Sequence, residues 1–156
     1  MAETPFQKVS RYLAVGFGAG YVPKAPGTAG AVVGIPVGLA INQASGLMVS
    51  LLLLLLLFVI SCVSSHVMAK SVGKKDPQVV VIDEIIGMAI ALWQLPCSMA
   101  VVLVQFMLFR LFDIYKPFPV KQMEDIFTGG AGIVMDDVMA GIMANVLFRV
   151  GGLILS

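Results

Sequence analysis

The chain has 156 residues, of which 59% are apolar and only 12% are charged. Soluble domains are about 45–50% apolar even when glycine is counted, and about 25% charged. This composition therefore excludes a disordered protein, a coiled coil and an ordinary soluble enzyme. The net charge is +1 without a basic stretch, so we expect no nucleic-acid partner. We expect one membrane-embedded domain over residues 1–156.

The charged residues fall into three blocks, which are separated by uncharged runs at residues 25–69 and 85–109. If each run is a helical hairpin, all three blocks lie on one side, which the positive-inside rule places in the cytoplasm. A single span over residues 85–109 would instead send the third block to the other side. The cations of the blocks are Lys8, Arg11 and Lys24; Lys70, Lys74 and Lys75; and Arg110, Lys116 and Lys121.

Hydropathy and turn residues predict five helices in chain order. The first, short and glycine-rich, covers residues 28–41, and a turn at 42–45 leads to the clearest span at 46–69. Two helices of about one crossing each follow at 77–95 and 98–115, and the last covers 136–155. The expected fold is all-α: a small polytopic helical membrane protein with about four to five membrane-embedded helices and its functional loops on the cytoplasmic face.

Two acidic pairs interrupt strongly apolar sequence. Asp83 and Glu84 stand within VVVIDEIIGM, and Asp136 and Asp137 stand within GIVMDDVMAG. Asp83 would lie about 10 Å inside its predicted helix, where a carboxylate is costly and is functional by default. A structural alternative for Asp136 is the N-cap of the last helix. Because that alternative leaves the other acids unexplained, we expect a functional acidic cluster.

A second group of charges ends the helix predicted at 98–115. Arg110 and Asp113 are three residues apart on one helix face, and Pro117 stops the helix directly after Lys116. One interpretation is a local ion pair of little energetic consequence. The other is that Asp113 binds a metal while Arg110 and Lys116 bind an anion. Oxygen ligands alone favour a hard cation such as Mg²⁺, and the single histidine, His66, argues against zinc.

The glycine-rich segment 16–30 offers a second place for an anion. A helix that starts near Gly27 would present N–H groups without partners, which attract phosphate, and Lys24 and Thr28 are placed to assist. The segment is neither GxGxxG nor a Walker loop. Its glycines could instead be helix-packing positions, and Lys24 could be an ordinary interfacial anchor.

Four stretches together resemble the phosphatidylglycerophosphatase A family, and they occur in the family's order. They are GFGAGYVPKAPGTAG (16–30), DPQVVVIDEIIGM (76–88), FRLFDIYKPFPV (109–120) and GGAGIVMDDVMAG (129–141). The resemblance implies a Mg²⁺-dependent, multi-pass enzyme of the bacterial cytoplasmic (inner) membrane, with its active site facing the cytoplasm. Its substrate would be the phospholipid phosphatidylglycerophosphate, and its products phosphatidylglycerol and inorganic phosphate.

The residues and the resemblance together give a catalytic hypothesis. Water attacks phosphorus with one carboxylate as base, and aspartate attack through a phosphoenzyme is the alternative. The expected catalytic and metal-binding residues are Asp83, Glu84, Asp113, Asp136 and Asp137, and the expected phosphate-binding residues are Arg110, Lys116, Lys24 and Thr28.

Two other classes of function stay open at this point. Buried carboxylates, glycine-rich helices and proline breaks also fit a small ion- or proton-coupled membrane transporter. A non-catalytic scaffold would leave the carboxylates without a role. A homo-oligomer is possible through the glycine-rich helix at 28–41.

Overall fold

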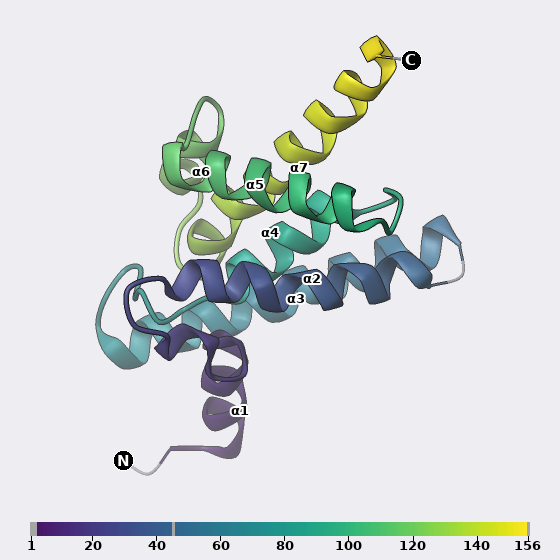
Figure 1. Ribbon diagram of the computed structural model, residues 1–156. Coiled ribbons are helices and arrows are strands. Elements are labelled where there is room, and N and C mark those ends of the chain that lie inside the picture. Colours follow the sequence, from purple (N-terminus) through teal and green to yellow (C-terminus); the bar gives the residue numbers. More distant parts are fainter. Residues whose placement is uncertain (1–2, 45, 156) are drawn as a thin grey trace.

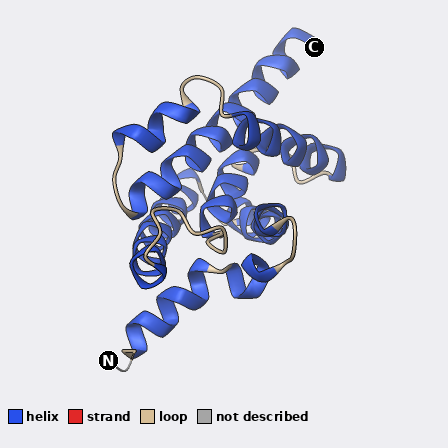
Figure 2. Ribbon diagram, turned by 90° about the vertical axis from the view of Figure 1, so that its left-hand side faces the viewer, coloured by secondary structure: helices blue, strands red, loops and turns tan. Residues whose placement is uncertain are grey.

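The computed structural model describes residues 3–44 and 46–155, and every regular element in those ranges is a helix (Figure 1, Figure 2). The predicted all-α class is therefore confirmed. In chain order the helices are α1 Pro5–Ala14, the 3₁₀ helix η1 Gly16–Tyr21, α2 Pro26–Gln43, α3 Leu47–Val72, α4 Ile82–Leu92, α5 Met99–Tyr115, α6 Val120–Ile126 and α7 Gly130–Leu155.

All five predicted helices are present, but two have different beginnings. The helix predicted over 77–95 is α4, which has 11 residues because the chain before Ile82 is an irregular loop. At 1.5 Å per residue α4 is about 16 Å long, too short to cross a hydrocarbon core of about 30 Å. The last helix begins six residues before the predicted position 136. Ser45, the end of the predicted turn, lies outside the described residues.

Two described helices are long and apolar enough to cross a membrane by length and composition, at Leu47–Val72 and Gly130–Ile154. In the most apolar 18-residue stretch of each helix, 22% of the residues are buried in the first helix and 56% in the second. The outer surface of α3 is therefore the more extensive apolar face, which is typical of contact with lipid. The expected number of four to five membrane-embedded helices stays a prediction.

The short helix α4 is the centre of the bundle, with α2, α3, α5 and α7 packed around it. On α2, glycines at every fourth position face α4: a Cβ added at Gly34 would lie 2.8 Å from Ile85 O, and one at Gly38 would lie 2.9 Å from Ala89 Cα. Small residues at this spacing let two helix backbones approach closely. Because these glycines pack inside the chain, they give no support to the predicted homo-oligomer.

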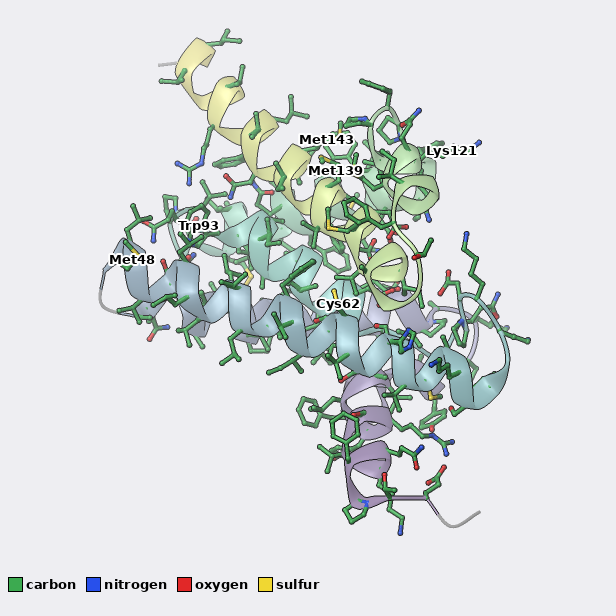
Figure 3. All side chains as sticks on the ribbon, turned by 180° about the vertical axis from the view of Figure 1, so that it is seen from behind. Met48, Cys62, Trp93, Lys121, Met139 and Met143 are labelled. Atoms are coloured by element: carbon green, nitrogen blue, oxygen red, sulfur yellow. The ribbon has the colours of Figure 1, made fainter. Side chains whose placement is uncertain are left out.

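Side chains from α2 and α7 cap the C-terminal end of α4. Asn42 Nδ2 donates to Leu92 O at 2.7 Å, and Asn145 Nδ2 donates to Trp93 O at 2.8 Å. Arg149 Nη2 donates to the same Trp93 O at 3.0 Å. Figure 3 labels Trp93 at this end of the bundle. The bonds satisfy carbonyls that a helix end leaves without partners, so they fix the position of α4 along its axis.

Candidate active site

A cavity of about 620 Å³ lies at the other end of α4, within the usual size of small-ligand sites. The structure brings all five predicted carboxylates to it, together with three of the predicted phosphate-binding residues; Thr28 is not in its lining. Lys121 is not in the lining either, and its side chain points outward from α6 (Figure 3). The charged lining residues are Lys24, Lys75, Asp76, Asp83, Glu84, Arg110, Asp113, Lys116, Asp136 and Asp137.

Three carboxylates form the tightest group in this cavity. One oxygen each of Asp83, Glu84 and Asp137 lies within 4.8 Å of the other two. Asp83 and Glu84 stand in the first turn of α4, where the helix dipole favours negative charge. The expectation that Asp83 lies about 10 Å inside its helix is therefore wrong, because the helix starts one residue before it. The N-cap interpretation of Asp136 is wrong as well, since α7 starts at residue 130.

The same three carboxylates suit a divalent cation. Asp83 Oδ1 and Glu84 Oε2 are buried and have no hydrogen-bond partner among the described residues, which is costly for a charged group. Burial, and then the neighbouring Glu84 charge, raise the pKa of Asp83 well above its ordinary value; burial also raises the pKa of Glu84. A cation among these oxygens would offset that cost, and hard cations such as Mg²⁺ prefer carboxylate ligands.

Two cationic side chains hold the remaining predicted carboxylates beside this group. Arg110 Nη1 pairs with Asp113 Oδ2 on the same helix, and Lys116 Nζ donates to Asp136 Oδ2 at 2.6 Å. Arg110 Nε and Asp136 Oδ1 are nevertheless buried without a hydrogen-bond partner in the described part of the chain. The predicted local ion pair is therefore present, and a donor and an acceptor remain beside the carboxylates for a ligand.

Backbone geometry that the sequence analysis missed shapes the cavity. Gly27, in the first turn of α2, lies so close to α4 and α5 that an added Cβ would collide with Glu84 Oε1 and come within 3.2 Å of Arg110 Nη1. Lys24 and Lys116 have left-handed φ angles of 72° and 43°. Such angles are uncommon outside glycine and cluster at functional sites. The sequence offers a signal only for Gly27, which follows a proline at a predicted helix start.

Known proteins resemble this chain over most of its length. The model of the family described as Phosphatidylglycerophosphatase A matches residues 12–151. Phosphatidylglycerophosphatase A of Haemophilus influenzae is 36% identical over 151 residues, 93% of each chain, and that of Escherichia coli is 37% identical over 141 residues, 89% of this chain and 81% of the relative. A putative phosphatidylinositol-3-phosphatase of Bacteroides thetaiotaomicron is 36% identical over 145 residues, 88% of this chain and 90% of the relative. No solved structure matches the chain. The resemblance noted in the sequence is thereby confirmed, and the chain belongs to the phosphatidylglycerophosphatase A family of phosphoric monoester hydrolases.

Proposed function

We propose that this chain hydrolyses the terminal phosphate monoester of phosphatidylglycerophosphate in a Mg²⁺-dependent reaction, giving phosphatidylglycerol and inorganic phosphate. The observation that carries the proposal is the meeting of two buried carboxylates, Asp83 and Asp137, and the half-buried Glu84 with Arg110 and Lys116 in one cavity. Carboxylates suit a divalent cation, and guanidinium and ammonium groups suit phosphate. The names of two relatives that match nearly the whole chain support the choice of lipid.

Asp83, Glu84 and Asp137 would hold the Mg²⁺, with Asp113 and Asp136 in the same cavity as further ligands. When bound, the ion would act as a Lewis acid that offsets the charge of the phosphate oxygens. The number of ions depends on how many of these five carboxylates contribute, and metal titration of the purified protein measures it.

The chain's own groups carry the remaining steps. Arg110, Lys116 and Lys24 bind the non-bridging phosphate oxygens, assisted by the N–H groups at the start of α2, and stabilise the charge of the transferring group. One carboxylate accepts the proton of the attacking water as the new O–P bond forms. The bond from phosphorus to the glycerol oxygen breaks, and that oxygen takes up a proton. The alternative is attack by an aspartate, followed by hydrolysis of the acyl phosphate.

We also propose that α3 and α7 cross the bacterial cytoplasmic membrane and that the cavity faces the cytoplasm. Basic residues line the cavity, whereas the loops around residues 44 and 95 at the other end carry no charge, the asymmetry that the positive-inside rule associates with the cytoplasm. Cys97 is exposed in the uncharged loop. A membrane-impermeant maleimide should label Cys97 in intact spheroplasts, but should label a C97S, K74C variant only after permeabilisation.

The function is tested by phosphate release from phosphatidylglycerophosphate in detergent, with Mg²⁺ and with a chelator. We expect release that requires Mg²⁺, and no release from folded protein in either condition would overturn the proposal. The Bacteroides relative suggests phosphatidylinositol 3-phosphate as a second substrate, so both lipids are compared by kcat/KM in the same micelles. The alternative function of a transporter gains no support. The acidic residues gather at the N-terminal end of α4, whereas side chains of α2 and α7 donate hydrogen bonds to the last carbonyls at its other end.

A further inference from the structure

Helix α1 presents three large apolar side chains to the outside of the bundle. Phe6, Val9 and Tyr12, about one turn apart, are 61%, 59% and 58% exposed, whereas Ser10 and Ala14 on the opposite side are buried. The basic residues Lys8 and Arg11 form a second stripe beside the apolar one. Helices with an apolar, aromatic stripe flanked by Lys and Arg are typical of the membrane interface, where they lie in the plane of the lipid surface.

The orientation of α1 agrees with such a position. Figure 1 shows α1 running crosswise to α2 and α3, and Figure 2 shows it extending away from the bundle. Helix α1 packs against α3, and its last residue, Ala14, belongs to the same buried cluster as Met68 in α3. A span that starts at Leu47 needs about 20 residues to cross the hydrocarbon core, so α3 would reach the membrane surface close to Met68. A helix attached there and running crosswise lies along that surface.

The same surface borders the mouth of the active-site cavity. A shallow depression between α1 and η1 is lined by Lys8, Arg11, Tyr12 and Tyr21, among others, and Tyr21 also lines the active-site cavity. Tyr12 and Phe17 pack edge to face with ring centroids 5.4 Å apart, which joins α1 to η1. The outer face of α1 and the cavity mouth are therefore parts of one continuous surface.

We propose that α1 binds the anionic lipid surface of the membrane and thereby holds the cavity mouth at the level of the lipid head groups. Phe6, Val9 and Tyr12 would enter the boundary between head groups and acyl chains. Lys8 would contact anionic head groups, with Arg11, which also pairs with Glu3, beside it. The basic stripe argues for anionic over zwitterionic lipid, since cationic side chains close to an anionic surface are attracted to it.

The position of α1 is tested by tryptophan fluorescence in proteoliposomes that contain anionic lipid. Trp93 is the chain's single tryptophan, so W93F supplies a silent background. We expect the emission of V9W to be blue-shifted and quenched by lipids brominated on their acyl chains at least about twice as strongly as that of the control K121W, at an exposed position on α6 whose side chain points outward. Equal quenching of the two variants, or water-like emission from both, would overturn the proposal. This measurement does not depend on the chain's activity.

The consequence for turnover rests on the proposed function and has its own control. With phosphatidylglycerophosphate in anionic vesicles, V9D should raise the apparent KM about tenfold, the factor expected when one valine no longer leaves water. With a water-soluble short-chain phosphate ester in detergent, V9D should match wild type. An equal loss on both substrates would assign Val9 a structural role and overturn the proposal. No activity of the wild type on either ester would contradict the proposed function, while the quenching result would still decide the position of α1.

Discussion

The two ends of α4 differ in how their polar groups are satisfied. At the C-terminal end, Asn42, Asn145 and Arg149 donate to the last carbonyls. At the N-terminal end, Asp83 Oδ1 and Glu84 Oε2, together with atoms of two neighbouring helices, are buried without a partner among the described residues. Native proteins leave few buried polar atoms unpaired, and they keep such costly arrangements at functional sites. One end of α4 is therefore an anchor, and the other is the end that we propose binds the ligand.

The largest effect should come from removing charge at the N-terminal end. D83N and D137N should each lower kcat about 10³-fold, in the range seen when one strong electrostatic contact to a transition state is lost. The melting temperature of the metal-free variants should stay the same or rise, because each substitution removes a buried negative charge that lies beside other carboxylates. Phosphate release and thermal unfolding in detergent measure both.

The exposed acid Glu3 provides the matched control, and E3Q should keep full activity in detergent. Activity within tenfold of wild type in both D83N and D137N would contradict the assignment of this end as the ligand site.

Metal binding should distinguish the two ends of α4 even without any substrate. A cation that binds only the folded protein adds about 2.7 kcal/mol of stability at a hundred times its Kd, so Mg²⁺ should raise the melting temperature of the wild type. D137N should lose most of this shift, whereas N145A at the other end should keep it. Equal shifts in wild type and D137N would mean that Mg²⁺ binds elsewhere.

The anchor end could not be predicted from the sequence, although much of the ligand end could. The acidic pairs and the helix stop after Lys116 are local signals, because carboxylates are rare in apolar sequence and proline ends a helix. The start of α4 has no such signal, since the valines before Asp83 are as apolar as a helix interior. The caps from Asn145 and Arg149 depend on contacts between segments more than 50 residues apart, which no local pattern encodes.

The close approach of α2 to the ligand end gives a smaller effect. In G27A the new methyl group would displace the side chains of Glu84 and Arg110 from their present positions. Because a displacement of a fraction of an ångström misplaces groups that act on the phosphate, G27A should lower kcat/KM about tenfold. G151A is the matched control, because an added Cβ there meets nothing within 4 Å. If G27A keeps wild-type kcat/KM, the contact of α2 with these two side chains does not matter for catalysis.

The smallest effect should come from the anchor end, and it should fall on stability instead of chemistry. N145A removes one of the two side-chain donors to Trp93 O, the other being Arg149, so it should lower the free energy of unfolding by about 1 kcal/mol, while V146A on the exposed side of the same helix should change it less. Its kcat should stay within about twofold of wild type, since α2 still caps Leu92 O through Asn42. A large loss of kcat at an unchanged melting temperature would contradict the proposed division between the two ends of α4. It would mean that the C-terminal cap sets the position of Asp83 and Glu84 one helix length away.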